Sequence, residues 1–357
     1  MPLKRSRLLL GVVLIVIILL VSILGLSHLG DTDDGVPGEL TPLDSPSSPQ
    51  RGFFMGVLPT PADGQSFDEA YVMASESCEF VPVWGKPSPF YNLPDDLEGS
   101  WGETFVDQYT RGNGMFPLVH FSFIDAGMTL KAPPGIDDAS LSDEEWRDAY
   151  RTSVLEVVRV ARPLYLSIGN EVNRWYEEYG ADVDDENGFQ HFVSLYNEIY
   201  DEVKAISNQT IVFCTFAREM VSELREADLD VLEFFDSDRM DLLVMTSYPH
   251  AVQGINSPQD IEDDYYSEAV NRMPGKAFGF SEIAWPSMYE FGGEQAQADF
   301  LNASIGRLTT GQGMELHMIA WSWLHDIDDN DETGLVDRDG SPKLAYGAWM
   351  DISSSVG

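Results

Sequence analysis

The sequence predicts an α/β chain whose main domain is a (β/α)8 TIM barrel. Eight short apolar runs recur between residues 51 and 350, and most of them are continuous rather than alternating. Continuous apolar runs are typical of parallel strands that are covered on both faces. Helix-like segments separate the runs. Eight such repeats over about 300 residues match a barrel of this class, which has roughly 250 residues plus insertions.

The eight runs are each five or six residues long or slightly shorter, as strands are. The predicted strands are Phe53–Leu58, Phe80–Trp84, Phe116–Phe121, Leu164–Ile168, Ile211–Phe216, Leu242–Thr246, Ala277–Phe280 and Leu316–Trp321.

Two of the intervening segments have clear helix signals. Ser142-Asp-Glu-Glu145 has the pattern of a capping box ahead of a helix over 146–160. The segment Phe189–Ile206 has apolar residues at helical spacing. An open doubly wound sheet is the alternative fold, but it usually has a glycine-rich phosphate loop after its first strand. Here Val57-Leu-Pro-Thr-Pro-Ala62 follows the first run, which favours the barrel.

The N-terminus predicts a membrane anchor ahead of the barrel. Three basic residues precede an uncharged apolar run, Leu8 to Leu26, which at about 1.5 Å per residue spans roughly 28 Å. Basic residues before the run place that end inside the cell and the rest outside. We therefore expect residues 1–26 to be a cytoplasmic stub with a single-pass signal anchor, 27–50 a flexible linker, and 51–357 the barrel. A cleaved secretory signal, giving a secreted protein, is the alternative.

The charge balance excludes several classes of partner. With 21 basic and 60 acidic residues, the formal net charge is −39. Such a surface repels nucleic acids and anionic lipid headgroups, so we expect no nucleic-acid partner and membrane contact only through the N-terminal helix. Neutral polymers and cations remain as candidate ligands. An acidic, lysine-poor surface also suits very salty surroundings, where ions screen its self-repulsion.

Two glutamates close to strand ends carry the chemical prediction. Glu171 follows the fourth run and Glu282 follows the seventh. Active sites of these barrels lie where the strands end, so both carboxyl groups should share one rim. Two carboxyl groups on one rim can hydrolyse a glycosidic bond, with retention at a separation of about 5 Å and inversion at roughly 6.5–9.5 Å. We expect the acid's pKa to be raised and the other carboxylate to stay ionised.

Gly169-Asn170-Glu171-Val172 and Ser281-Glu282-Ile-Ala-Trp285-Pro286 resemble the signatures of a clan of retaining (β/α)8 glycoside hydrolases. The two motifs are most similar to those of arabinogalactan endo-β-1,4-galactanases and endo-β-1,3-glucanases. The resemblance implies that Glu171 is the acid/base, Glu282 the nucleophile, and Asn170 a donor to the sugar 2-hydroxyl. The chain departs from both families at Ala284, where they usually have glycine, and from the galactanases at Phe123-Ile-Asp-Ala-Gly127.

The same resemblance implies roles for Tyr248 and His120. Tyr248, in Thr246-Ser-Tyr-Pro249, matches the aromatic residue that hydrogen-bonds the nucleophile, although core packing is the alternative. His120, in Leu118-Val-His-Phe-Ser122, matches a strand-end motif of the galactanases, and an interior histidine is the alternative.

Tryptophans near the strand ends are candidates for sugar platforms, because indole rings stack on the C–H faces of sugars. Trp84, Trp285, Trp321 and Trp323 occupy such positions. The alternative is that they fill the barrel mouth. Between Trp321 and Trp323, the resemblance favours Trp321 as the residue that faces the barrel axis.

No cofactor or metal is expected. The acidic segment Asp326–Asp337 has alternating oxygen ligands, but it lacks the glycine and the final glutamate of an EF-hand loop. We interpret it as a solvated acidic loop. The sequence thus predicts a retaining β-glycoside hydrolase that acts at internal bonds of an extracellular polysaccharide or oligosaccharide. A non-catalytic glycan-binding barrel and a transglycosylase that remodels surface glycan are the alternatives.

Overall fold

The structure is a computed structural model that describes residues 39–84, 89–310, 314–328 and 331–355. The predicted anchor over residues 1–26 lies outside the described residues, as do residues 27–38 of the predicted linker. Across the ranges that are described, no helix is long and apolar enough to cross a membrane.

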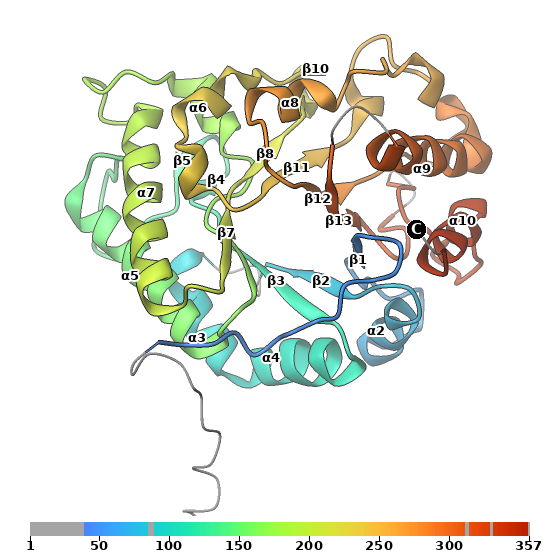
Figure 1. The fold of residues 1–357 in the computed structure, drawn as a ribbon, viewed down its shortest axis with the longest axis horizontal. Helices are drawn as coiled ribbons and strands as arrows, with labels where there is room; N and C mark the ends of the chain where they lie inside the picture. Colours follow the sequence, from blue (N-terminus) through green and yellow to red (C-terminus); the bar gives the residue numbers. More distant parts are fainter. Residues whose placement is uncertain (1–38, 85–88, 311–313, 329–330, 356–357) are drawn as a thin grey trace, which may run out of the picture. The chain divides into compact units, whose positions relative to one another are not determined.

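Nine parallel strand segments form a nearly closed barrel, consistent with the predicted fold class (Figure 1). Each of the eight predicted runs contributes to it. The segments are β1 (Phe54–Val57), β2 (Phe80–Val83), β3 (Phe116–His120), β6 (Tyr165–Ser167), β7 (Ile211–Phe213), β8 (Thr215–Ala217), β11 (Leu243–Ser247), β12 (Phe278–Ile283) and β13 (Leu316–Trp321).

The fifth predicted run closes the barrel in two pieces. Its first half, β7, pairs with β6, and its second half, β8, pairs with β11. Only Cys214, a buried free thiol, separates the two halves. On the other side of the barrel, β1 pairs with both β2 and β13. The two ends of the sheet are therefore joined through the chain itself, which brings the fourth and seventh runs to one rim.

Helices surround the barrel, with α5 and α7 on one side and α9 and α10 on the other (Figure 1). Their bounds are α2 (Phe67–Ser75), α3 (Leu93–Glu98), α4 (Ser100–Gly102), α5 (Glu144–Ala161), α6 (Asn173–Tyr179), α7 (Phe189–Ile206), α8 (Ser267–Arg272), α9 (Gly293–Thr310) and α10 (Leu344–Ser353). The helix predicted over Phe189–Ile206 is confirmed. In α5 the N-cap is Asp143, whose side chain accepts from the Glu145 N–H, so the cap lies one residue later than predicted.

Aromatic side chains fill the end of the barrel where the strands begin. Phe54 and Phe116 make an edge-to-face pair with ring centroids 5.2 Å apart. Tyr165 stacks on Phe116, and its hydroxyl lies 2.6 Å from His317 Nε2. This packing closes that end, so the barrel is solid there and open only at the ends of the strands.

The chain enters the barrel at the closed end. The Leu40 N–H donates to the carbonyl of Ile206, the last residue of α7, and the Leu43 N–H donates to the carbonyl of Arg162, directly after α5. In a βα repeat each helix ends where the next strand begins, so Leu40 and Leu43 lie at the end of the barrel opposite the C-terminal ends of the strands.

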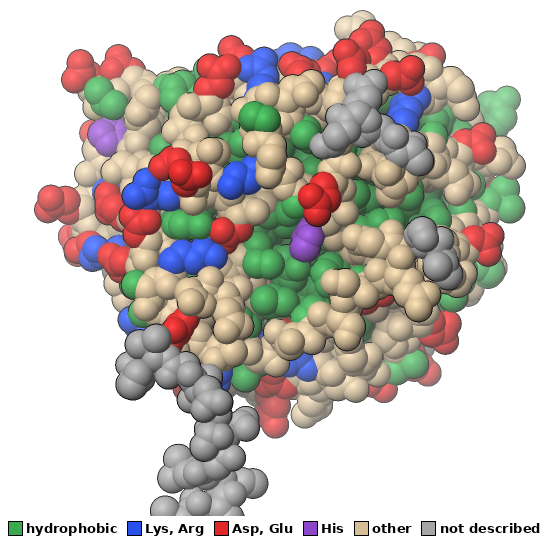
Figure 2. Space-filling view, viewed as in Figure 1, with side chains coloured by type: hydrophobic (Ala, Val, Ile, Leu, Met, Phe, Trp, Pro, Cys, Tyr) green, Lys and Arg blue, Asp and Glu red, His purple; other side chains and the backbone are tan. Residues whose placement is uncertain are grey.

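Figure 2 shows acidic side chains over the outside of the protein.

Candidate active site

The local sequence before Glu171 bends the chain sharply at the end of β6. A Cβ atom on Gly169 would lie 2.5 Å from Val172 Cγ1 and 2.9 Å from Phe192 Cζ, so the packing requires glycine there. Glu171 itself has a φ of 47°, in the left-handed region that side-chain-bearing residues rarely adopt. Such strain persists only where surrounding contacts enforce it, and it is typical of functional positions.

Thr215, in β8, holds this bend in place. The Glu171 N–H donates to Thr215 Oγ1 at 3.0 Å. The Thr215 hydroxyl in turn donates to Asn170 Oδ1 at 2.6 Å. With its oxygen engaged in this way, Asn170 has its NH2 group to offer to a ligand in the hollow that it lines. Sequence reasoning missed Thr215, because its role depends on the split of the fifth strand.

Both carboxylate oxygens of Glu171 accept a donor. The Thr246 hydroxyl donates to Oε1 at 2.8 Å, and Arg174 in α6 contacts Oε2 at 3.0 Å. Arg174 is about half exposed, with 45% of its side chain accessible, whereas the Glu171 side chain is 20% accessible. Glu171 therefore lies at the water-facing side of the mouth. It can exchange its Arg174 contact for one to a ligand.

Glu282 lies deeper than Glu171. It is the second-to-last residue of β12 and does not follow the strand as the sequence predicted. The Tyr248 hydroxyl donates to Glu282 Oε2 at 2.6 Å and lies 3.0 Å from Ser322 Oγ. Burial and, second, the negative charge of Glu171 raise the pKa of Glu282 to about 7, although the Tyr248 hydrogen bond opposes the shift. Burial and the charge of Glu282 also raise the pKa of Tyr248, so this hydroxyl stays protonated and remains a donor. Sequence reasoning placed the raised pKa on the acid, Glu171; the structure places it on Glu282, which is the more buried of the two.

The end of β11 brings the two glutamates together. Thr246 donates to Glu171, and in the strand register Thr246 lies beside Glu282. Neighbouring strands are about 4.8 Å apart. Two residues later, Tyr248 donates to Glu282. Two residues at the end of β11, Thr246 and Tyr248, thus contact one carboxyl group each, and the predicted pair of glutamates lies in one site with Asn170 and Tyr248.

A buried carboxyl group, Glu219, fixes the backbone of Tyr248. The Tyr248 N–H donates to Glu219 Oε2 at 2.6 Å, while the Ser247 and Tyr265 hydroxyls donate to Oε1 at 2.9 and 2.8 Å. Only 4% of Glu219 is exposed, and this burial raises its pKa to about 7, against the effect of its three hydrogen bonds. Sequence reasoning missed Glu219, since nothing near Ala217-Arg-Glu-Met220 marks it as supporting a tyrosine on the next strand.

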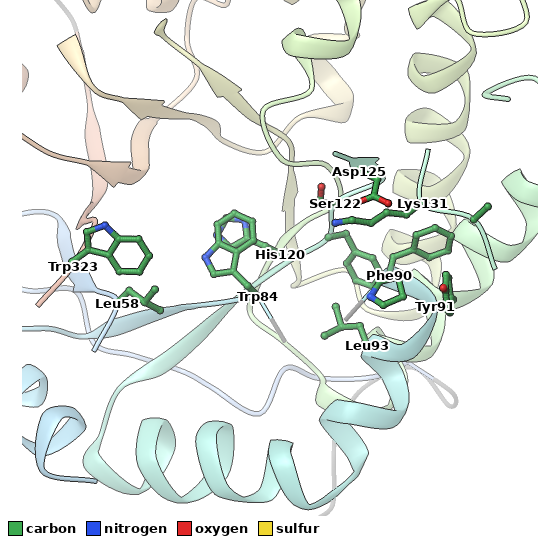
Figure 3. Close-up of a pocket in the computed structure, with 13 residues that line it drawn as sticks. Leu58, Trp84, Phe90, Tyr91, Leu93, His120, Ser122, Asp125, Lys131 and Trp323 are labelled. Carbon is green, nitrogen blue, oxygen red and sulfur yellow. The ribbon is translucent and has the colours of Figure 1, made fainter. Parts of the chain in front are cut away.

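The site opens into a cleft of three adjoining hollows. A central hollow of about 300 Å³ is lined by Asn170, Glu282 and Ser322. It shares Trp84, Leu58 and Trp323 with a long arm of about 860 Å³. Trp323 also lines a shorter arm of about 520 Å³ on the other side, next to Tyr248. Figure 3 shows Trp323 and Trp84 on either side of Leu58.

The expectation that Trp285 and Trp321 are sugar platforms is wrong for this structure. Both side chains are fully buried. Their indole N–H groups donate to the backbone carbonyls of Phe291 and Thr333, at 3.1 and 2.7 Å. A ring with no accessible face cannot stack on a sugar, so these tryptophans pack the barrel wall. The ring that borders the cleft at the end of β13 is the half-buried Trp323, because the chain bends at Ser322 after the strand.

His120 lies where β3 ends, and its ring stacks on Trp84 with centroids 3.9 Å apart and an interplanar angle of 9°. Burial lowers its pKa to about 3, so the ring is neutral at ordinary pH. Within the described part of the chain, neither ring nitrogen has a hydrogen-bond partner. Trp84 and His120 therefore form one flat wall of the long arm.

The acidic segment after β13 is less solvated than predicted. Asp326 is buried, and the Lys343 ammonium lies 2.6 Å from its Oδ1. Burial raises the pKa of Asp326 to about 6, while Lys343 lowers it. The first acidic residue of the segment is thus paired with an internal lysine and is not solvated. Residues 329–330 of this segment lie outside the described residues, and the described ones contain no group of acidic, histidine or cysteine side chains suited to a metal ion.

Comparisons with known proteins identify the fold. No family model and no curated protein matches the chain. Among solved structures, GH5_18 from Streptomyces cattleya in complex with GlcNAc has a TM-score of 0.60 at 15% identity, covering 86% of this chain and 80% of its own. A family 39 glycoside hydrolase from Bacteroides cellulosilyticus has a TM-score of 0.57 at 17% identity, with 87% and 65% coverage.

A β-glucuronidase from Bifidobacterium dentium has a TM-score of 0.56 at 12% identity, covering 85% of this chain and 47% of its own. The barrel of this protein therefore has the fold of several glycoside hydrolases. At these identities the likeness concerns the fold, and the function is argued from the site.

Proposed function

We propose that this protein hydrolyses β-glycosidic bonds by double displacement, with Glu282 as the nucleophile and Glu171 as the general acid and base. The observation that carries the proposal is the support that one strand end gives to both carboxyl groups. Thr246 donates to Glu171, and Tyr248 donates to Glu282. Glu282 lines a hollow large enough for a sugar ring, and Asn170, which directly precedes Glu171, lines the same hollow.

The chemistry needs one proton on the pair of glutamates. Glu171 must hold it to protonate the leaving oxygen, and Glu282 must be ionised to attack the anomeric carbon. The charge of Glu171 contributes to the raised pKa of Glu282. When Glu171 takes up the proton, this repulsion disappears and Glu282 ionises more easily. The Tyr248 hydroxyl then stabilises the carboxylate.

In the second step, hydrolysis of the glycosyl–enzyme ester, Glu171 acts as the general base. After the leaving group departs, Glu171 is a carboxylate and can deprotonate the water that attacks the glycosyl–Glu282 ester. Thr246 and Arg174 both donate to Glu171, so they stabilise this ionised state. A sugar or water that displaces Arg174 favours return of the proton.

The proposed substrate is a chain of sugars cut at an internal bond. Two further hollows adjoin the central one, and the half-buried rings of Trp84 and Trp323 border the cleft. Flat aromatic faces suit the C–H faces of sugar rings. One of the fold neighbours was solved with GlcNAc, which supports a carbohydrate ligand.

The apolar run before residue 27 supports a location at the outer side of a membrane. Alkaline extraction of the full-length protein, compared with protein lacking residues 1–26, tests this membrane attachment.

Azide rescue separates the two roles. Glu171→Gln should lower turnover by about 10²–10⁴-fold, the usual contribution of a general acid and base. Azide should restore activity to Glu282→Gly with a sugar azide of inverted configuration, and to Glu171→Ala with one of retained configuration. The opposite pattern would exchange the roles. Unaltered hydrolysis by Glu171→Gln across a panel of β-linked polysaccharides would refute the proposal.

A further inference from the structure

The long arm of the cleft contains a cation that the proposed chemistry does not use. Lys131 lines this arm together with Ser122, Asp125 and the Trp84–His120 wall. Figure 3 shows the amine end of Lys131 beside Ser122 and directed toward the Trp84–His120 stack. Trp323 lies at the other end of the same view, next to the central hollow. Trp84 lines both the long arm with Lys131 and the central hollow with Glu282, so Lys131 lies in the part of the cleft that suits a neighbouring sugar rather than the reacting one.

The backbone of Lys131 is held rigidly. Its carbonyl accepts from Trp146 Nε1 at 2.7 Å, and its N–H donates to the Phe123 carbonyl at 2.8 Å. Trp146 is fully buried against Tyr150 in α5, so this anchor belongs to the core. The base of the lysine side chain is fixed, and its position in the arm follows from the packing.

The ammonium group of Lys131 has no ion pair within the described ranges, although acidic residues dominate the chain. Lys204 and Lys343 contact Asp241 and Asp326, each at 2.6 Å. Lys131 is half-buried, and burial lowers its pKa, with the charge of Asp125 opposing the shift. Removing an ammonium group from water without a partner is unfavourable, so an anion that reached this arm would be stabilised.

We propose that the long arm binds an anionic sugar residue, with the Lys131 ammonium group contacting its carboxylate or sulfate and the Trp84–His120 wall contacting its ring. This deepens the proposed function, on which it rests, by assigning an acidic glycan as the substrate class. Asp125 is exposed in the same arm and weakens the attraction without cancelling it, because water screens its charge more than that of half-buried Lys131. His120 carries no charge at ordinary pH and does not oppose the anion.

The small number of lysines makes the site directly observable. The chain has six lysines. Reductive methylation with ¹³C-formaldehyde gives each lysine an NMR signal and keeps its charge, and the signal that disappears in Lys131→Met identifies Lys131. The spectra are recorded on full-length Glu282→Gln, which should not turn over ligand. The added probes are methyl β-glucuronide, methyl β-glucoside 6-sulfate, methyl β-glucoside and sodium acetate, each up to about 50 mM.

We expect the two acidic glycosides to shift the Lys131 signal with saturation, and the neutral glycoside and acetate to leave it in place. Whichever acidic glycoside saturates at lower concentration identifies the anion. Lys276, which is half-buried near the start of β12, is the matched control, and its signal should not move. Asp125→Asn should tighten acidic ligand binding severalfold. Lys131→Met should weaken it by about tenfold, as expected for loss of one charge-assisted hydrogen bond, and Lys276→Met should not.

An unmoved Lys131 signal, or equal shifts with the neutral glycoside, would overturn the proposal. Equal shifts with acetate would show simple ion attraction and would overturn it as well. Because this measurement requires no turnover, its result is independent of the azide experiment. An acidic-sugar response in a protein that hydrolyses nothing would retain the binding site and reject the hydrolase.

Discussion

Glu171 and Glu282 have different surroundings although they share one mouth. Glu171 faces water and accepts from Thr246 and Arg174, whereas Glu282 is held from below by Tyr248. The deeper group has the raised pKa, and part of that shift comes from the charge of the other. The protonation of one glutamate therefore depends on the other, and apparent pKa values in rate profiles belong to the pair.

Tyr248→Phe tests the hydroxyl that contacts the nucleophile. The Tyr248 hydrogen bond lowers the pKa of Glu282, so its loss should raise that pKa further. Because attack needs ionised Glu282, the acidic limb of the kcat/KM profile should move to higher pH, and activity should fall more at pH 6 than at pH 8. A profile of kcat/KM against pH checks this. The same factor of loss at both pH values would contradict it.

Trp321 and Trp323 offer a matched pair of substitutions. Trp323→Ala should raise KM with little loss of stability, because its ring borders all three hollows and is only half-buried. Trp321→Ala should instead lower the unfolding free energy by about 3–5 kcal/mol, since its buried ring would leave a cavity. Thermal unfolding and steady-state kinetics distinguish the two. Equal effects of both changes on KM would restore Trp321 as a sugar contact.

At the scale of elements, the end of β11 organises the site. Thr246 and Tyr248 point to the two carboxyl groups, and between them Ser247 donates to Glu219. Alternation along the strand sends Ser247 to the other face, where Tyr265 and Tyr266 lie in hydrogen-bonding distance of the same network. The position of Tyr248 is thus fixed from both faces of its strand.

Glu219→Gln tests this support through pH. Burial raises the pKa of Glu219 from 4.5 to about 7, so its contribution to stability is full below pH 4.5 and is lost as the pH rises through 7. The variant should lack this loss, a difference of up to about 3 kcal/mol between pH 4.5 and pH 8. Denaturant unfolding of both proteins at the two pH values measures it.

The control for that experiment is Glu226→Gln, which removes a more exposed partner of Arg218. It should keep the pH dependence of the unmodified protein. An identical pH dependence for Glu219→Gln and the unmodified protein would show that Glu219 is ionised at neutral pH.

The sequence predicts most of the barrel because buried parallel strands are apolar throughout, and all eight runs become strands. It also predicts the two glutamates, which follow from strand ends. The sequence does not predict the supporting residues of the site, because their roles depend on which strands become neighbours. Thr215 and Glu219 are ordinary residues in the chain and acquire roles only when β8 pairs with β11. The choice of Trp321 over Trp323 failed because a turn after β13 decides it.

At the scale of the whole molecule, charge is the dominant feature. The net charge of −39 exerts a self-repulsion that salt relieves, with the screening length falling from about 10 Å at 0.1 M to about 3 Å at 1 M. We expect the melting temperature to rise steadily from 0.1 to 2 M salt. Sodium and potassium chloride should act alike if screening is the cause, and calorimetry checks this. A melting temperature that does not change with salt would contradict it.

The entry of the chain at Leu40 has a practical consequence. Leu40 and Leu43 hydrogen-bond to the ends of α7 and α5, beneath the barrel, whereas Glu171 and Glu282 lie at its mouth. A resin coupled through an N-terminal tag on the fragment from Leu40 onward would hold each molecule by its base. Long, stiff polymers could then reach the open end of the barrel without steric hindrance from the bead. The N-terminal side is therefore the suitable point of attachment for an immobilised reagent.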